Sequence, residues 1–348
     1  MKSSPIGLLC FLLAACGENA VETSAPLNTS GQELTPVTVG TSGNEPLLAA
    51  AADGTLYITA LQYLYRSTDG GASWIKLPGP PLLSTVLASD SAIAFDPSGR
   101  IYFSFDYPYA GTTAVCTSDD RGDSWFCNPA VVPGGTDRMW VTAPTDEAAY
   151  VVSNLGLYQT AFLASSDRGQ TWTVTKFGNG LLAPQTGPLL QKPAGVEVLQ
   201  PAKMSAYSFY AYAVSDLSAA LSDTRTVGIP NPYALPSAAF DGAGLLYTAS
   251  ESERGEVQVA RSGDEARSWN VLPPVPQTRK GTAVFSWLAA GAAGHVGVIY
   301  YHTPDNIDPN VTTDAVWSAW WAESFNADAA EPDWSATLLE EKVHTGRI

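Results

Sequence analysis

The chain has 348 residues, 45% of them hydrophobic and 10% aromatic, with a formal net charge of -16 at pH 7. Eighteen Lys and Arg against 34 Asp and Glu argue against nucleic acid as a partner, because phosphate binding needs a cationic face. The hydrophobic residues occur in short alternating runs and no long amphipathic helix is visible, which favours an all-β domain with a sizeable core.

The N-terminus has the pattern of an export signal. A positively charged start is followed by an apolar run at 6–15, too short to span a bilayer, and then by Cys16. This pattern resembles the bacterial lipobox, which implies removal of residues 1–15, lipid attachment to Cys16 and, with Gly17 next, an outer-membrane location in the cell envelope. An ordinary cleaved signal is the alternative. Residues 16–42 are rich in Ser, Thr, Asn, Glu and Gly and predict a flexible tether ahead of one domain at 43–348.

A strand, turn, strand layout recurs along that domain. Each copy is an apolar strand, a short turn rich in Asp and Gly, and a second strand containing Tyr, which is the pattern of a β-hairpin. The copies are 46–60, 91–105, 139–153, 236–250 and 287–301.

A second repeat, S-x-D-x-G-x-[ST]-W, follows four of these hairpins at 67–74, 118–125, 165–172 and 262–269. Its Asp is expected to accept a backbone N–H two residues on, its Gly to adopt a positive φ, and its Trp to cover the core below the turn. The last copy has Ala266 in place of Gly, which predicts a strained or altered turn. The aspartates are Asp69, Asp120, Asp167 and Asp264.

The spacing of the aspartates indicates a β-propeller. The intervals are 51, 47 and 97 residues, the last close to two periods, and periods of this length with several short strands are typical of four-stranded propeller blades. Six blades are predicted, with seven as an alternative; the fourth is degenerate, and the sixth has no octapeptide. Their approximate ranges are 45–80, 90–130, 138–178, 190–230, 236–273 and 284–340.

The octapeptides and their period resemble the Asp-box (BNR) propellers, the superfamily that includes sialidases, over roughly residues 45–340. That resemblance implies that the four aspartates are structural, between the third and fourth strands and away from the ligand site. A sialidase would also need an arginine motif in its first blade, because several guanidinium groups hold the substrate carboxylate. The segment 44–48 (NEPLL) has no arginine, which argues against sialidase chemistry, and no catalytic residue is assigned.

Candidate ligand-binding residues come from propeller geometry, since the loops that enter the innermost strands surround the central channel. A capping or packing role is the alternative for each, and Asp137 and Arg138 are candidates to pair with each other. The other arginines in or beside the octapeptides, such as Arg66, are expected at the solvated periphery. The candidates are Glu45, Asp90, Asp137, Arg138, Tyr233, Ser286 and Trp287.

Cysteine and histidine content limits the remaining chemistry. Cys116 and Cys127 flank the second octapeptide, one on each strand, so a cross-strand disulfide in an oxidising compartment is predicted, with two free thiols as the alternative. Only three histidines occur, far apart in sequence, so no metal and no cofactor are predicted. An acidic loop at 303–315 is either a solvated loop or a calcium site.

The sequence therefore favours a lipid-anchored cell-envelope protein, monomeric, whose propeller binds a glycan or an envelope protein at its central rim. A sialidase-like glycoside hydrolase and a scaffold for an envelope complex are the two alternatives.

Overall fold

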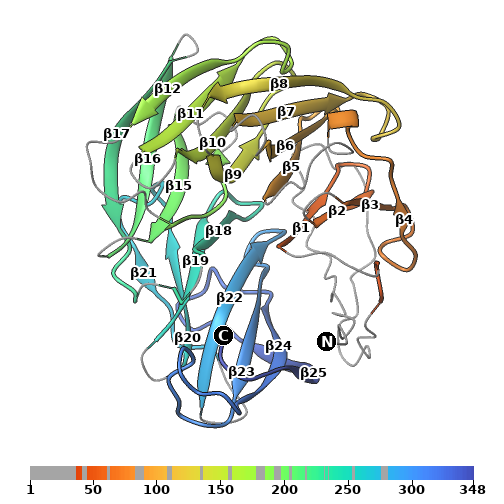
Figure 1. The fold of residues 1–348 in the computed structure, drawn as a ribbon. Helices are drawn as coiled ribbons and strands as arrows, with labels where there is room; N and C mark the ends of the chain where they lie inside the picture. Colours follow the sequence, from red (N-terminus) through yellow and green to blue (C-terminus); the bar gives the residue numbers. More distant parts are fainter. Residues whose placement is uncertain are drawn as a thin grey trace.

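The protein is an all-β propeller of six blades (Figure 1), seen here in a computed structural model. The structure describes residues 37–40, 45–60, 63–82, 90–107, 112–133, 136–155, 159–177, 185–191, 197–203, 206–215, 218–230, 232–233, 235–252, 255–275 and 281–348. The prediction of six four-stranded blades is confirmed.

The first three blades each follow the chain outward from the centre. Blade 1 contains β1 (Pro46–Ala50), β2 (Leu56–Ala60), β3 (Tyr63–Ser67) and β4 (Ile75–Lys76); blade 2 contains β5 (Ser91–Phe95), β6 (Ile101–Tyr107), β7 (Thr112–Ser118) and β8 (Phe126–Pro133); blade 3 contains β9 (Thr136–Thr142), β10 (Ala149–Leu155), β11 (Gln159–Ser165) and β12 (Thr173–Phe177). All neighbouring strands are antiparallel.

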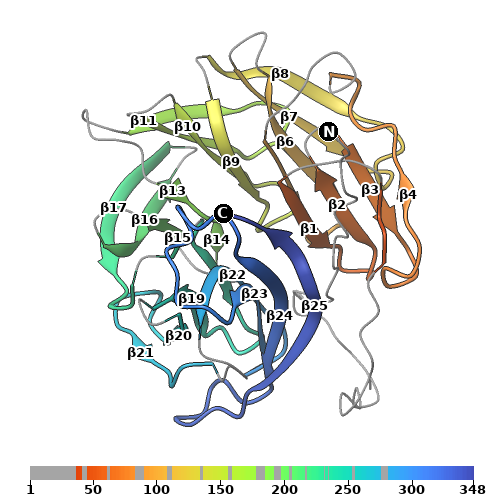
Figure 2. The same ribbon diagram turned by 60° about the horizontal axis from the view of Figure 1, so that its bottom comes forward.

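The last three blades continue the ring (Figure 2). Blade 4 contains β13 (Gln185–Thr186), β14 (Leu190–Gln191), β15 (Glu197–Lys203), β16 (Tyr207–Ser215) and β17 (Ser218–Thr226); blade 5 contains β18 (Ser237–Phe240), β19 (Leu246–Glu251), β20 (Val257–Ser262) and β21 (Asn270–Val271); blade 6 contains β22 (Thr282–Ala290), β23 (Val296–Thr303), β24 (Val316–Ser324) and β25 (Ser335–Thr345). In blade 4, β13 and β14 both pair with β15 and together take the place of one inner strand.

The hydrophobic core is divided among the boundaries between blades. Five clusters of buried side chains join blades 1 and 2, 2 and 3, 3 and 4, 4 and 5, and 5 and 6, respectively. Tyr102 and Tyr247, which the hairpin repeat placed at equivalent positions, are both fully buried in such clusters. A side chain of this size contributes roughly 2–3 kcal/mol when fully buried, so packing between blades is a major source of stability.

The four octapeptides form equivalent turns between the third and fourth strands of blades 1, 2, 3 and 5. In the first copy, Ser67 Oγ donates to Asp69 Oδ1 (2.8 Å) and accepts the Gly71 N–H (2.9 Å). The Asp69 carboxylate accepts the N–H of Ser73 (2.9 Å), four residues on, so the expected acceptance from two residues on is wrong. Gly70 and Gly71 both have positive φ, and this double left-handed step brings the more distant N–H to the carboxylate.

The same hydrogen bonds lower the pKa of these carboxyl groups. Donation from the side chain and then the backbone of Ser73 holds the pKa of Asp69 at about 2. Ser124 does the same for Asp120, whose pKa is also about 2. The octapeptide aspartates are therefore occupied as ionised acceptors within their own turns.

Ala266 adopts the turn conformation that glycine holds elsewhere. Its φ is 67°, its side chain is fully buried and its N–H still bonds to Ser262 Oγ (2.9 Å), so the turn is strained but not altered. Trp74 Nε1 donates to the Gly71 carbonyl at 3.0 Å. The equivalent Trp269 Nε1 has no hydrogen-bond partner among the described residues.

Blade 6 contains a related turn that the octapeptide pattern does not detect. Ser324 Oγ donates to Asn326 Oδ1 (3.0 Å), and the same oxygen accepts the N–H of Asp333 (2.8 Å), immediately before Trp334. Asn326 thus takes the role that Asp69 has in blade 1. Blade 6 has no octapeptide, as predicted, because the loop between Ser324 and Trp334 is three residues longer and Asn replaces Asp, but it keeps the hydrogen bonds of the turn.

Arginine side chains connect these turns to the preceding blade. In each case a guanidinium Nη1 donates to a backbone carbonyl in the turn of the next blade. The pairs are Arg66 with Arg121 (2.8 Å), Arg100 with Arg168 (3.0 Å), Arg225 with Glu265 (2.7 Å) and Arg261 with Ala327 (3.0 Å). Arg66 was expected in solvent, but its side chain is only 15% exposed because it lies in this boundary.

The predicted disulfide joins Cys116 on β7 to Cys127 on β8, which face each other in the strand register. The predicted signal segment and the predicted lipidation of Cys16 fall on residues outside the described part of the chain, as does the predicted tether except for residues 37–40. Among the described residues, no helix is long and apolar enough to cross a membrane.

Candidate functional site

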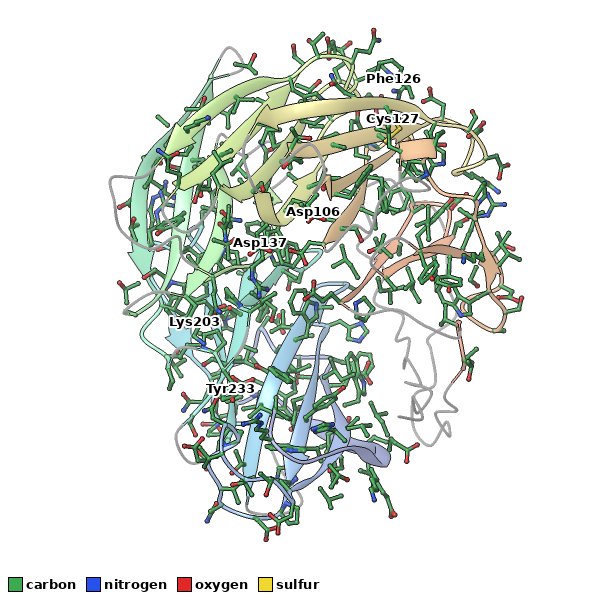
Figure 3. The ribbon with its side chains drawn as sticks, viewed as in Figure 1. Asp106, Phe126, Cys127, Asp137, Lys203 and Tyr233 are labelled. Carbon is green, nitrogen blue, oxygen red and sulfur yellow. A yellow bond between two sulfur atoms is a disulfide. The ribbon has the colours of Figure 1, made fainter. Side chains whose placement is uncertain are left out.

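One face of the propeller collects the starts of the inner strands and the ends of the second strands, because the two strands run antiparallel in every blade. We number each second strand from its first residue that pairs with the inner strand. Residue six in this count lies at this face. Three of these five side chains are charged, and they differ from blade to blade. In blades 2 to 6 they are Asp106, Leu155, Lys203, Glu251 and Tyr301. Figure 3 shows Asp106 and Asp137 in blades 2 and 3, and Lys203 and Tyr233 further around the ring.

Carboxyl groups from three blades meet at the entries of β1, β5 and β9. The Asp90 carboxylate accepts the backbone N–H of Arg138 at 2.7 Å, which joins blade 2 to blade 3. Asp106 Oδ1 in turn accepts the Asp90 N–H at 3.0 Å. The side chains of Glu45 and Asp137 both hydrogen-bond to that of Asp90. The Arg138 guanidinium lies 3.8 Å from the Asp137 carboxylate.

This arrangement makes two of the acids hold their protons unusually tightly. Burial and the bond to Asp90 raise the pKa of Asp137 to about 6, against the opposing charge of Arg138. Burial and the nearby Glu45 also raise the pKa of Asp90, while donation from Asp137 and from the Arg138 N–H opposes that rise. The two carboxyl groups therefore favour a shared proton more than an isolated carboxyl does, and the larger rise in pKa is at Asp137.

A second carboxylate organises the entries of blades 5 and 6. Glu251 is only 7% exposed, and it accepts the N–H of Tyr233 at 2.8 Å through Oε2 and the N–H of Ser286 through Oε1. Lys203 Nζ donates to the Tyr233 carbonyl at 2.8 Å. Burial lowers the pKa of Lys203, whereas the charge of Glu251 acts in the opposite direction. The Tyr233 backbone is therefore fixed from both sides.

Aromatic rings flank this second carboxylate. Phe285 makes edge contacts with Tyr233, at 5.5 Å between ring centroids, and with Tyr301, at 6.0 Å. The Tyr233 hydroxyl donates to Asn310 Oδ1 at 2.6 Å and to the Ile348 carbonyl at 3.2 Å. Phe285 itself is 36% exposed.

Trp287 lies closer to the centre and packs across it. Its ring stacks on that of Trp140 at 5.9 Å between centroids and 25° between planes, which joins blade 6 to blade 3. Trp140 Nε1 donates to the Thr186 carbonyl of blade 4 at 3.0 Å. Leu47 of blade 1 packs against the same cluster. The side chain of Trp287 therefore has a packing role across the ring.

Backbone strain is concentrated at this face. Outside the octapeptide turns, the non-glycine residues with positive φ among those described are Glu45 (48°), Arg138 (51°) and Phe285 (56°), all at entries of inner strands. The strands β9 and β22 have irregular register at these points. A side chain in this conformation costs on the order of 1–3 kcal/mol and persists only where surrounding contacts hold it.

The structure groups the sequence-predicted residues into two sets. Glu45, Asp90, Asp137 and Arg138 come together in one, and Tyr233 and Ser286 meet at Glu251 in the other. Trp287 belongs to neither. Sequence reasoning missed Asp106, Lys203, Glu251 and Phe285. A signal for two of these was present, because Asp106 and Glu251 each lie four residues after the buried Tyr of their hairpin.

The described arginines do not assemble a carboxylate clamp around Arg138. Arg225 lies at the outer part of blade 4, where it pairs with Glu197 at 2.8 Å. Arg66, Arg100 and Arg261 are occupied in the connections between blades. In the described part of the chain, no three His, Cys, Asp or Glu side chains are arranged to hold a metal ion.

No family model matches the chain, and no curated protein matches it. Among solved structures, it is similar to "YCF48 bound to D1 peptide" at 14% identity and a TM-score of 0.52, over 81% of this chain and 78% of that one. It is similar to the alpha-L-arabinanase of Penicillium chrysogenum complexed with arabinobiose at 13% identity and 0.52, over 85% and 92%. The Hadza microbial sialidase Hz136 matches at 15% identity and 0.49, over 73% and 62%. The first two similarities show the propeller fold.

Proposed function

We propose that this protein is a binding propeller that recognises a glycan or a protein on the face where the inner strands begin. The observation that carries the proposal is the gathering of three strained, non-glycine residues at this face, Glu45, Arg138 and Phe285. The strain is maintained by backbone N–H groups that donate to carboxylates, as Arg138 N–H does to Asp90. Strain that folding does not require is typical of ligand sites.

We also propose that the protein is an Asp-box propeller anchored in the bacterial cell envelope through lipid on Cys16. The shared geometry of the octapeptide turns supports the first part. The disulfide supports an oxidising compartment. The wild-type protein should incorporate a radioactive fatty acid and associate with membranes, and Cys16→Ser should lose both properties. Equal labelling of both proteins would contradict the anchor.

A glycoside hydrolase is the second candidate, because a carboxyl group with a pKa of about 6, such as Asp137, suits a general acid. Its partner carboxyl, however, is in hydrogen-bond contact. Hydrolases keep the two groups roughly 5 Å or more apart, leaving room for the sugar or water. Tyr233 also differs from a tyrosine nucleophile: burial and then the charge of Asp308 raise its pKa, and Glu251 bonds to its N–H rather than its hydroxyl. Binding is therefore favoured over hydrolysis.

The test is to apply the full-length protein to arrays of defined oligosaccharides and of envelope peptides, and to assay glycosyl release in parallel. Arg138→Ala and Asp137→Asn should each weaken binding about tenfold or more. Arg121→Ala serves as the control, because this exposed arginine lies in an octapeptide turn. If the control weakens binding as much as the rim variants, the proposed face is wrong. Glycosyl release lost in Asp137→Asn would instead support the hydrolase.

A further inference from the structure

The entry of β22 contains a bulge, as does that of β9, and the β22 bulge places an aromatic residue at the left-handed position. Its register with β23 passes from Val284 opposite Tyr301 to Trp287 opposite Ile299, so two residues, Phe285 and Ser286, face one. Such a bulge redirects a side chain. Here it presents the Phe285 ring, 36% exposed, at the face where inner strands begin.

The contacts around the bulge fix its conformation. Glu251 accepts the N–H of the residue after Phe285 and also the N–H of Tyr233, so one buried carboxylate places both rings. Lys203 holds the Tyr233 carbonyl at 2.8 Å. Phe285 has a φ of 56°, a strained backbone conformation that a bulky residue rarely adopts. A partly exposed ring gains little packing energy to offset this strain, so folding alone does not explain its position.

We propose that Phe285 and Tyr233 form a subsite that stacks against the apolar face of a neutral sugar ring, with Glu251 as a positioning residue. This inference rests on the proposed binding function and names its ligand class. A pyranose ring has an apolar C–H face and polar edges. The exposed Phe285 ring matches the face, and the Tyr233 hydroxyl and the exposed Asn310 lie beside it for the edges.

Peptides and acidic sugars fit this surface less well. An apolar peptide side chain needs no polar partner, whereas the Tyr233 ring beside Phe285 presents a hydroxyl that bonds to Asn310. Acidic sugars are repelled by the net charge of -16 and by the carboxyl groups at Asp90 and Asp137. Neutral sugars meet neither penalty.

The experiment measures binding of the full-length protein to an array of defined neutral and acidic oligosaccharides and to a peptide array. Phe285→Ala should reduce binding to neutral oligosaccharides at least about tenfold, and Phe285→Trp should retain it. Phe126→Ala is the matched control, because Phe126 is 54% exposed on the outer strand β8 (Figure 3). Glu251→Gln should weaken binding less than Phe285→Ala.

A stability readout separates a binding role from a structural one. Phe285→Gly removes the ring but accepts the left-handed backbone, so it should be more stable than Phe285→Ala and still bind weakly. If binding falls across these variants only in proportion to their loss of stability, the subsite is wrong.

The remaining outcomes are also decisive. If Phe285→Ala binds like the wild type while Arg138→Ala does not, the subsite is wrong and the proposed function stands. If only peptides, or only acidic sugars, bind through Phe285, the neutral-sugar class is wrong. If neither array shows binding, the proposed function fails together with the subsite.

Discussion

Single residues at the strand entries are held in conformations and protonation states that an isolated chain would not favour. Arg138 is left-handed because the Asp90 carboxylate binds its N–H, and Asp90 in turn bonds to Asp137 and Glu45. Three acids this close cannot all ionise without repulsion. The charge of this face therefore changes near the pKa of Asp137, and the stability of the fold should change with it.

Replacing Asp137 with Asn tests that link. The unfolded carboxyl titrates near about 3.9, and the folded one near 6, so the folded state binds the proton more tightly. The free energy of unfolding therefore falls as pH rises from about 4 to about 6. Asp137→Asn should remove this fall and melt higher than the wild type at pH 7.5, with a smaller difference at pH 4.5.

Thermal denaturation between pH 4.5 and 8 makes the measurement. Asp146→Asn is the control, since Asp146 lies in an exposed turn of the same blade. A wild-type melting temperature that rises through pH 6, relative to Asp137→Asn, would contradict the assignment.

At the scale of elements, the outer turns and the register of the strands have different determinants. The octapeptide turn depends on a short sequence, which four blades share. The blade 6 turn shows that the hydrogen-bond geometry survives a three-residue insertion and Asn326 in place of Asp. The four octapeptide turns, unlike the blade 6 turn, depend on residues with positive φ and on the space around them.

Gly122→Ala should destabilise the protein more than Gly99→Ala, although both glycines have a φ near 90°. A Cβ at Gly122 would lie 2.9 Å from Leu77 and 3.3 Å from Trp125, whereas one at Gly99 meets nothing within 4 Å. Backbone strain alone costs about 1 kcal/mol, and the close contacts add about 1–3 kcal/mol. Urea denaturation of both variants gives the comparison, and equal losses would rule out the steric contribution.

Blade 4 has a tight β16–β17 hairpin instead of the octapeptide turn, and a buried ion pair connects it to blade 5. Arg225 and Glu197 side chains are 6% and 12% exposed, and Arg225 also reaches the Glu265 carbonyl. Removing the arginine would leave the carboxylate buried with less compensation.

Arg225→Ala should therefore lower the free energy of unfolding by about 2–4 kcal/mol. Arg121→Ala breaks an exposed pair with Asp53 and should cost about 1 kcal/mol or less. Guanidinium denaturation at two salt concentrations measures both. Similar small losses in the two variants would show that the Arg225 cluster is not a buried connection.

The whole molecule is held together both around the ring and across it. Five hydrophobic clusters join consecutive blades, and the Trp140–Trp287 stack joins blades 3 and 6 across the centre. Contacts across the ring connect residues far apart in sequence, so their loss affects the cooperativity of the whole domain.

Trp287→Ala should destabilise the propeller by about 2–4 kcal/mol, and Trp287→Phe should recover more than half of that loss by keeping a stacked ring. Denaturation followed by fluorescence and by circular dichroism makes the test. If Trp287→Ala left the midpoint unchanged, packing across the centre would contribute little, and a ligand-contact role for Trp287 would regain support.

From the amino-acid sequence alone, the blade ranges and the outer turns of blades 1, 2, 3 and 5 were predictable, with six blades favoured over seven. These features depend on local patterns, such as alternation within strands and the Ser–Asp–Gly–Trp turn, that repeat with one period. Cys116 and Cys127 were predictable for the same reason, because one hairpin sets their register.

The arrangement of the strand entries depends on contacts that form only in the folded ring. Glu251 and Lys203 act on the backbone of Tyr233, which comes from another segment, and Phe285 is exposed by a bulge that no local pattern marks. The raised pKa of Asp137 likewise depends on burial and on Asp90, which the ring brings beside it. Contacts between blades fix these features. A repeat pattern describes only what the blades share, so it cannot predict features that differ from blade to blade.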